Sequence, residues 1–406
     1  MDKMNLAILG AGRIATTMAG TVSAMDEVNL YAIAARDGER AKAFAEKYGA
    51  QKFYGSYEEM LQDPQVDLVY IATPHSLHCE HAKLCINHGK PVLCEKAFTW
   101  NAKEAREVLE LAHEKGVFIT EAMWTRYTPQ SEKLRELLYG GSVSRWGTSV
   151  SEAAGIETKE SGAQMGANGQ MEPTAGECRS AAGIAVCPDA DSAGGSNTGI
   201  PHKAAVGGLP AGMPQRVVAG ESRPGGGRIG QIVGLTANLG YSLLDKERMV
   251  RPELAGGALL DLGVYTLNFA TWVLGDDIQS ISSSMVLHET GVDKSEFINL
   301  VYPNGTIAGL FNTMDAVSDR RGIIFGTEGR IEVENTNNYE EIRIYNNDYE
   351  LVETIPQPPQ ITGYEYEVLA CKRALEQGKL ECEEMPHAHT LRVMELLDEI
   401  QTQWGK

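Results

Sequence analysis

A short glycine-containing turn near the N-terminus constrains the fold of this chain more than any other feature. The residues Gly10-Ala11-Gly12-Arg13-Ile14-Ala15 lie between an apolar run, Asn5–Leu9, and a helical stretch that begins at Ile14. In this pattern the first glycine permits a tight turn, the second lets the backbone approach a pyrophosphate, and the small third residue allows the strand and the helix to pack closely. The amide groups at the start of the helix can then bind phosphate oxygens. The turn therefore predicts a dinucleotide-binding βαβ unit.

The chain continues this alternation of strands and helices over residues 1–122, where we expect a Rossmann domain. Apolar strands that alternate with helices of about 10–15 residues are typical of a parallel sheet covered on both faces. The expected strands are Asn5–Gly10, Asn29–Arg36, Val66–Thr73, Pro91–Glu95 and Val117–Glu121, and the expected helices follow Ile14 and span Glu39–Tyr48, His78–Asn87 and Ala102–Lys115.

The pattern changes in the rest of the chain, residues 123–406. Strand-like runs follow one another with short turns between them, which predicts a large, open and mostly antiparallel sheet. The fold class is therefore α/β, with an N-terminal Rossmann domain and a C-terminal α/β domain. The expected strands are Ile229–Tyr241, Ile278–His288, Glu296–Tyr302, Thr306–Thr313, Arg321–Gly326, Arg330–Glu334 and Glu341–Tyr345, and the expected helices are Ser131–Tyr139, Gly256–Leu274, Tyr364–Gln377 and His387–Trp404.

One segment fits neither part. Residues 144–228 hold 17 of the 43 glycines and a single aromatic residue, Trp146. A structureless loop of this length is uncommon inside a compact domain. We therefore interpret the segment as a disordered insertion into the C-terminal domain.

Charge and cysteine usage exclude several classes of protein. The 36 basic and 55 acidic residues give a net charge of −19, which disfavours binding to nucleic acids and to anionic membrane surfaces. The apolar stretch Gly256–Gly275 is interrupted by Asp261 and favours a buried helix over a membrane span. Seven scattered cysteines and an N-terminus without the pattern of a signal peptide favour a reduced, cytoplasmic protein.

The end of the second expected strand bears on the choice of cofactor. The run Ala34-Ala35-Arg36-Asp37 places Arg36 where an arginine accommodates the 2′-phosphate of NADP. Asp37 is a rival, because a carboxylate at this position takes the ribose 2′-hydroxyl of NAD, or it caps the next helix. The pattern favours NADP and keeps NAD as the alternative.

Two further groups of residues are candidates for chemistry. Lys96, in Cys94-Glu95-Lys96-Ala97, follows a parallel strand, where ligands of open α/β sheets bind. It either holds a substrate oxygen or is a surface lysine paired with Glu95. Asp261 and Tyr265 share one face of an apolar helix, so they either line a cavity or are satisfied polar groups of the core.

Three histidines, His75, His78 and His81, recur every three residues. A zinc site normally has four ligands at recognisable spacing, and these histidines lie where a helix begins beside the nucleotide. We therefore expect no metal site. We assign Gly10, Gly12, Arg13, Ile14, Arg36, Thr73, His78, Glu95 and Lys96 to the cofactor site.

Together these motifs resemble the Gfo/Idh/MocA family of NAD(P)-dependent oxidoreductases. The resemblance covers residues 5–141 and 230–405, and it is strongest to the family's branch of dimeric dihydrodiol dehydrogenases and NADP-dependent D-xylose 1-dehydrogenases. It implies a Rossmann domain followed by an α/β domain with a large open sheet, and a homodimer or higher homo-oligomer formed through that sheet. The matching motifs are Gly10–Ala15, Ala34–Asp37, Cys94–Lys96, Glu121–Arg126 and Gly256–Tyr265.

The resemblance also implies roles for single residues. Lys96 matches the family's Glu-Lys-Pro lysine at the nicotinamide, although Ala97 replaces the proline. Tyr265 matches the catalytic tyrosine of the branch, and Asp261 matches an acid one turn before it. Trp124 and Arg126, from the Trp-Thr-Arg motif, are assigned to the substrate pocket.

These assignments predict an enzyme that transfers a hydride between NADP and a secondary alcohol or hemiacetal carbon of a sugar, a cyclic polyol or a dihydrodiol. Tyr265 would be the general acid or base, and a nearby Lys96 would lower its pKa. Two alternatives stay open. One is a redox-assisted glycosidase that retains its cofactor, and the other is a non-catalytic NADP-binding sensor.

Overall fold

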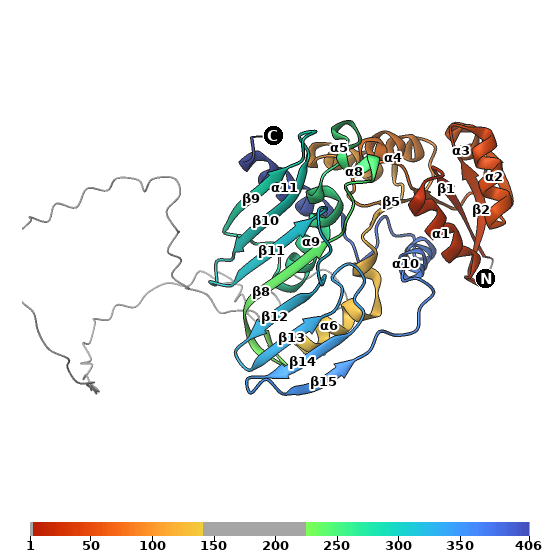
Figure 1. Cartoon of the computed structure of the whole chain (residues 1–406). Helices are drawn as coiled ribbons and strands as arrows, with labels where there is room; N and C mark the ends of the chain where they lie inside the picture. The colour runs from red at the N-terminus through yellow and green to blue at the C-terminus, as the bar shows by residue number, and fades with distance from the viewer. Residues whose placement is uncertain (1–2, 141–224, 406) are drawn as a thin grey trace, which may run out of the picture. The chain divides into compact units, whose positions relative to one another are not determined.

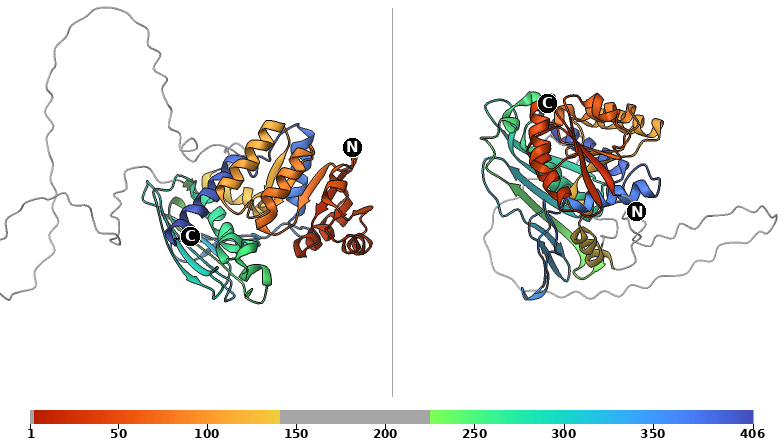
Figure 2. Two further views of the ribbon diagram at one scale, coloured as in Figure 1. Left: turned by 90° about the horizontal axis from the view of Figure 1, so that it is seen from above. Right: turned by 90° about the vertical axis from the view of Figure 1, so that its right-hand side faces the viewer.

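The N-terminal part of the chain forms a six-stranded parallel sheet with helices on both faces (Figures 1 and 2). The computed structural model describes residues 3–140 and 225–405. The strand order is β3-β2-β1-β4-β5-β6, which is the order of a Rossmann fold. The strands are β1 (Met4–Leu9), β2 (Val28–Ala34), β3 (Lys52–Tyr54), β4 (Leu68–Ile71), β5 (Val92–Glu95) and β6 (Ile119–Ala122), and the helices are α1 (Arg13–Ser23), α2 (Gly38–Tyr48), α3 (Tyr57–Leu61), α4 (His78–Asn87) and α5 (Ala102–Lys115).

The C-terminal part forms a nine-stranded mixed sheet. Its order is β15-β14-β13-β12-β8-β11-β10-β9, and β7 pairs with β8. Among the strands that the structure describes, only β8 and β11 are parallel neighbours in this sheet, so the predicted, mostly antiparallel sheet is confirmed. The strands are β7 (Gly225–Gly227), β8 (Gly230–Gly240), β9 (Ser280–Leu287), β10 (Asp293–Val301), β11 (Ile307–Thr313), β12 (Gly322–Gly326), β13 (Gly329–Val333), β14 (Ile342–Asn346) and β15 (Leu351–Ile355).

Helices connect and cover these two sheets. The first helical segments after β6 are η2 (Trp124–Tyr127) and α6 (Pro129–Tyr139), and the chain ends with α10 (Glu365–Glu376) and α11 (His387–Gln403). Helix α11 packs on α5 of the Rossmann sheet, where Arg106 pairs with Glu395 at 2.7 Å and the amide of Ala102 donates to Asp398 at 3.0 Å. The six-stranded sheet uses residues 4–122 and the nine-stranded sheet uses residues 225–355. The domain boundary after residue 122 stays a prediction.

Most of the expected insertion lies outside the described residues. The part that is described, residues 225–228, belongs to the fold, because Gly225 and Gly227 pair with Gln231 and Gly230. Arg228 also pairs with Glu353 at 2.8 Å.

The apolar helix expected at Gly256–Leu274 begins later than predicted and contains a wider turn. The sequence expectation was wrong at its start, because Gly257 adopts a φ of +126° and the Asp293 carboxylate accepts a hydrogen bond from the amide of Leu259 at 2.7 Å. A π-helical turn, η4 (Leu259–Gly263), then leads into α9 (Val264–Leu274). The segment Pro252–Leu274 is long and apolar enough to cross a membrane, but its apolar window is entirely buried inside the protein, as expected of a core helix.

Candidate active site

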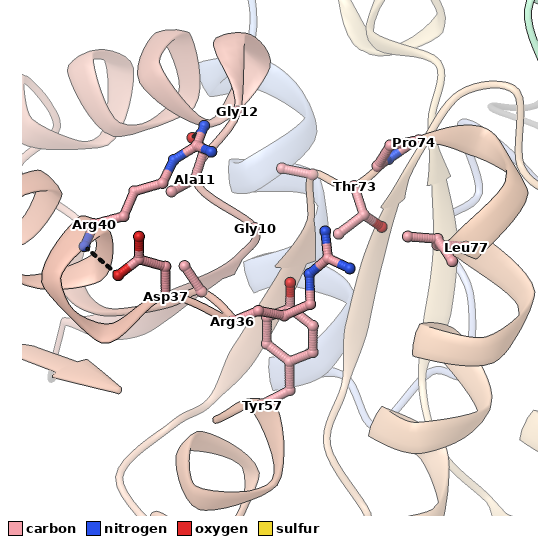
Figure 3. Close-up of a pocket in the computed structure, with 12 residues that line it drawn as sticks. Gly10, Ala11, Gly12, Arg36, Asp37, Arg40, Tyr57, Thr73, Pro74 and Leu77 are labelled. Atoms are coloured by element: carbon pink, nitrogen blue, oxygen red, sulfur yellow. Dashed lines mark hydrogen bonds between the residues drawn. The ribbon is translucent and has the colours of Figure 1, made fainter. Parts of the chain in front are cut away.

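A pocket of about 420 Å³ lies at the carboxyl ends of the first parallel strands (Figure 3). Gly10, Ala11 and Gly12 form one wall, the end of β2 forms a second, and Thr73 and Pro74 after β4 form a third. Gly10 has a φ of +103°, and a Cβ atom there would lie 2.9 Å from Cγ2 of Thr73. The turn therefore requires glycine at this position, as the sequence predicts.

The structure distinguishes the roles of Arg36 and Asp37, the two candidates for contact with the cofactor's ribose or its 2′-phosphate. The Asp37 carboxylate caps α2, since it accepts hydrogen bonds from the amides of Glu39 and Arg40 at 3.0 and 3.3 Å. Arg36 is exposed, lines the pocket and lies with its guanidinium above Tyr57 (Figure 3). The charge available at the strand end is therefore positive, which fits a phosphate.

A second arginine at this end of the pocket escaped the sequence analysis. Arg40 lines the pocket, and its guanidinium donates to the carbonyl of Ala11 in the glycine turn at 2.6 Å. No motif marks it, because it occupies the first turn of α2, where an exposed basic residue is ordinary. Only the packing of α2 beside the glycine turn reveals its position.

The other residues assigned to the cofactor differ in whether they line this pocket. Thr73 lines the pocket, whereas Arg13 and Ile14 are absent from its lining. His78 is fully buried, and its ring nitrogens lie 2.9 Å from the carbonyls of Thr73 and Ala97. Burial lowers its pKa to about 4. His78 thus links the loops after β4 and β5 and does not itself face the pocket.

Lys96 and Asp261 meet directly, although 165 residues separate them in the sequence. The Lys96 ammonium donates to the Asp261 carboxylate at 3.0 Å and to its main-chain carbonyl at 2.9 Å. The Lys96–Ala97 peptide bond is cis. Burial raises the pKa of Asp261, but the charges of Lys96 and Arg248 outweigh that effect and hold the pKa well below its usual range. Asp261 is therefore an ionised partner of Lys96 and cannot serve as a proton donor near neutral pH.

Glu95, which precedes Lys96, points away from the ammonium. Its carboxylate accepts hydrogen bonds from the Tyr70 hydroxyl and from the amide of Lys96. Burial raises the pKa of Glu95. The alternative of a surface lysine paired with Glu95 is therefore excluded, since the ion pair of Lys96 is with Asp261 and the Lys96 side chain is only 12% exposed.

Tyr265 lies beside this pair. The Lys96 ammonium lies 4.8 Å from the centre of the Tyr265 ring, and the Tyr265 hydroxyl accepts a hydrogen bond from Nε1 of Trp124 at 3.0 Å. Trp124 in turn stacks on Tyr364, with ring centres 4.3 Å apart and planes within 3°. Tyr364, at the start of α10, is a further residue of the site that no sequence pattern indicated.

The lowered pKa that the sequence analysis expects for Tyr265 is wrong for this structure. Burial raises the pKa of the Tyr265 hydroxyl well above 10, and the neighbouring Tyr364 and Glu95 raise it further. The hydrogen bond from Trp124 lowers the pKa, but the net shift is upward. The Lys96 ammonium is directed at Asp261 and lies 4.8 Å from the centre of the Tyr265 ring. Tyr265 is consequently a neutral phenol that can donate a proton.

Arg126 does not join this group. Its guanidinium is buried, lies 3.8 Å from the centre of the Trp272 ring and donates to His389 at 2.8 Å. Burial lowers its pKa to about 9. Its assignment to the substrate stays a prediction. In this structure it extends from η2 and contacts Trp272 of α9 and His389 of α11.

The pocket fits a dinucleotide on two observations. The glycine turn has no room for a side chain at Gly10, and α1 begins at Arg13, directly after Gly12, without a side-chain cap or an acidic residue in its first turn. Such a helix start suits an anionic pyrophosphate. In the described residues no group of three or more His, Cys, Asp or Glu side chains is arranged to hold a metal ion.

Comparisons with known proteins agree with this geometry. A model described as "Oxidoreductase family, NAD-binding Rossmann fold" matches residues 4–123, and a model described as "GFO/IDH/MocA C-terminal domain" matches residues 225–332. A trans-1,2-dihydrobenzene-1,2-diol dehydrogenase from Xenopus tropicalis is 28% identical over 98% of this chain and 97% of its own length. A D-xylose 1-dehydrogenase (NADP(+)) from Hypocrea jecorina is 29% identical over 90% of this chain and 81% of its own length.

Solved structures show the same fold. An aldose-aldose oxidoreductase from Caulobacter crescentus aligns with a TM-score of 0.71 and 17% identity over 100% of this chain and 98% of its own. A 3-ketoreductase from Actinomadura kijaniata, solved with NADP, aligns with a TM-score of 0.69 and 19% identity over 99% and 98% of the two chains. With its NAD-binding Rossmann domain and its C-terminal sheet domain, the chain belongs to the Gfo/Idh/MocA family of NAD(P)-dependent oxidoreductases.

Proposed function

We propose that this enzyme interconverts a secondary alcohol or hemiacetal and the corresponding carbonyl compound, with NADP as the preferred cofactor. The observation that carries the proposal is the convergence of Lys96, Asp261 and Tyr265 from β5, η4 and α9. This group provides a cation for a substrate oxygen and a phenol for its proton. The relatives that are named as dihydrodiol and D-xylose dehydrogenases support a carbohydrate-like or cyclic diol substrate.

The nicotinamide, when bound, accepts or supplies the hydride of this reaction. The chain's own residues handle the oxygen and its proton. In reduction, the Tyr265 hydroxyl donates a proton to the carbonyl oxygen, and in oxidation the Tyr265 phenolate accepts the proton of the alcohol. Lys96 stabilises negative charge on that oxygen, and Asp261 orients Lys96 through two contacts. Trp124 orients the phenol through its indole N–H.

The raised pKa of Tyr265 favours its role as a proton donor in reduction at neutral pH. Oxidation requires the phenol to lose its own proton before or during catalysis, so alkaline pH assists it.

The preference for NADP is supported by the two arginines at the β2 end of the pocket. Arg36 is free to approach a 2′-phosphate, while Asp37 is committed to the cap of α2. An NADP-dependent relative and NADP-complexed structural neighbours agree with this choice.

An absorbance screen at the NADPH band tests the proposed activity. Full-length protein is incubated with NADP or NAD against a panel of aldoses, inositols and trans-diols, and with NADPH against the corresponding carbonyl compounds. We expect NADP-dependent turnover with at least one member of the panel. Tight NADP binding without turnover in either direction would favour a non-catalytic sensor, and release of a glycoside's leaving group without net NADPH formation would favour the redox-assisted glycosidase.

We also propose that the protein is a cytoplasmic homodimer. Phe297 of β10 and Phe311 of β11 are direct cross-strand partners, and both are exposed on the large sheet. Ile307 and Val286 extend this apolar face, which suits a second copy of the chain. The five cysteines of the described residues are all free, which supports a reducing compartment. Light scattering coupled to size exclusion tests the dimer, which a monomeric mass would exclude.

A further inference from the structure

Arg248 contacts the proposed active site, yet neither the mechanism above nor any sequence pattern uses it. It lies on a single short turn, α8 (Glu247–Val250), which precedes the core helix. Its two terminal nitrogens donate to the two oxygens of Asp261 at 3.1 and 3.0 Å. The Asp261 side chain is only 8% exposed, whereas that of Arg248 is 49% exposed. A half-exposed arginine thus binds both oxygens of a buried carboxylate.

The same carboxylate also holds the proposed catalytic lysine. Oδ1 of Asp261 accepts from Nη1 of Arg248 and from the Lys96 ammonium, so two cations share one anion. Without Arg248, Lys96 and Asp261 would form a closed, neutral pair. With Arg248, the three side chains carry a net charge of +1.

Three other titratable groups of the described residues lie around this triad, and none of them forms an ion pair with Lys96. His75 lies 4.0 Å from the Asp261 carboxylate, and burial lowers its pKa to about 3, so it is neutral. Glu95 is buried, and its carboxylate accepts hydrogen bonds from the Tyr70 hydroxyl and the Lys96 amide, so it does not take the place of Asp261 at the Lys96 ammonium. The third is Tyr265, whose ring lies next to the Lys96 ammonium. The Tyr265 hydroxyl stays neutral, because burial raises its pKa.

We propose that Arg248 is a positioning residue for Lys96: by binding both oxygens of Asp261, it fixes the carboxylate and leaves the lysine charge available to a substrate oxygen. The proposal rests on the proposed function for its catalytic meaning. The bidentate geometry fits this role, because a planar guanidinium sets the orientation of a carboxylate, which a lysine cannot do.

Chemical labelling of Lys96 tests the proposal without any substrate. The full chain is treated with limiting acetic anhydride, which acylates only the neutral amine, and acetylation of Lys96 is measured by mass spectrometry relative to the exposed Lys115. The variants are Arg248→Met, Asp261→Asn and the double variant. The matched control is Arg251→Met, because Arg251 lies three residues on and pairs with Glu247 and Glu253 at the surface.

Arg248→Met should slow the acylation of Lys96. Without Arg248, the Asp261 carboxylate interacts with Lys96 alone and stabilises its ammonium form more strongly. We expect a decrease of about three- to tenfold, the scale of removing one partly screened neighbouring charge. Arg251→Met should leave the rate unchanged. In the Asp261→Asn background, the further loss of Arg248 should change the rate less than twofold, because the carboxylate that couples the two cations is absent.

An unchanged or faster acylation of Lys96 in Arg248→Met would overturn the proposal. Equal effects of the Arg248 substitution with and without Asp261 would also overturn it, because Arg248 would then act on Lys96 directly. If Arg248→Met does not fold, Arg248→Lys replaces it, with an intermediate decrease expected and a wild-type rate as the contrary result. The labelling is independent of turnover, so a failed substrate screen would contradict the proposed function and leave this result intact.

Discussion

Replacement of Arg36 by alanine should separate the affinities for NADP and NAD. Arg36 is exposed at the β2 end of the pocket and makes no hydrogen bond or ion pair within residues 3–140 and 225–405, so its guanidinium is available to a phosphate. A hydrogen bond to a charged group contributes about 1.5–3 kcal/mol, and solvent screening of an exposed side chain reduces this to about 1–2 kcal/mol. Arg36→Ala should therefore weaken NADP binding by roughly 5- to 30-fold. NAD lacks the 2′-phosphate and should bind as before.

Isothermal titration calorimetry of each cofactor against wild type and Arg36→Ala measures this difference. The wild-type preference for NADP should shrink as salt rises, since the contact is electrostatic and exposed. Lys42→Ala is the matched control, because Lys42 is an exposed cation of α2 that does not line the pocket. Equal losses of affinity for NADP and NAD in Arg36→Ala would refute the assignment of Arg36 to the 2′-phosphate.

Three further predictions follow from the site. Gly10→Ala should abolish cofactor binding in calorimetry and lower the melting temperature, because the new Cβ atom would lie 2.9 Å from Cγ2 of Thr73. Gly20→Ala is the control and should bind the cofactor normally, because its Cβ atom would have no neighbour within 4 Å. Trp124→Phe removes the indole N–H that binds the Tyr265 hydroxyl, so kcat should fall by up to about tenfold, the scale of one neutral hydrogen bond; an unchanged kcat would show that the phenol needs no such support. Because the pKa of Tyr265 is raised, the rate of reduction should stay level from about pH 6 to 9 while that of oxidation rises, and opposite slopes in steady-state profiles would contradict a neutral phenol.

The sequence predicted the periodic elements of the fold well. The bounds expected for α4 and α5 match the structure. For α5 a strong amphipathic pattern coincides with clear ends, Asn101 before the helix and the left-handed Gly116 after it. The short elements β3, α3, α8 and β15 were missed. β3 and β15 lie at the edges of their sheets and are largely exposed, so they lack the apolar run that marks the equally short, buried β5 and β6. α3 and α8 are single short turns, too short to show a helical period.

The candidate site was predicted only where a motif or the family resemblance marks the residue. Lys96, Asp261 and Tyr265 were identified in this way, and the structure brings them together. Arg40 and Arg248 were missed, because each contributes one side chain from a short or exposed turn with no characteristic spacing. The protonation state of Tyr265 was also out of reach, since it depends on burial and on the direction of the Lys96 ammonium, which spacing in the sequence does not encode.

The most direct test of the account is the rate of hydride transfer in Tyr265→Phe. The substitution removes only the hydroxyl, so the buried helix should keep its packing, and Tyr302→Phe, which removes a buried hydroxyl bonded to the Gly275 carbonyl, is the matched control. Single-turnover absorbance at the NADPH band, with a deuterated substrate to show that hydride transfer limits the signal, gives the rate. The account predicts a decrease of about 10²- to 10⁴-fold in Tyr265→Phe with little change in NADP affinity and a wild-type rate in the control. A wild-type rate in Tyr265→Phe under these conditions would contradict the central claim that this phenol moves the proton.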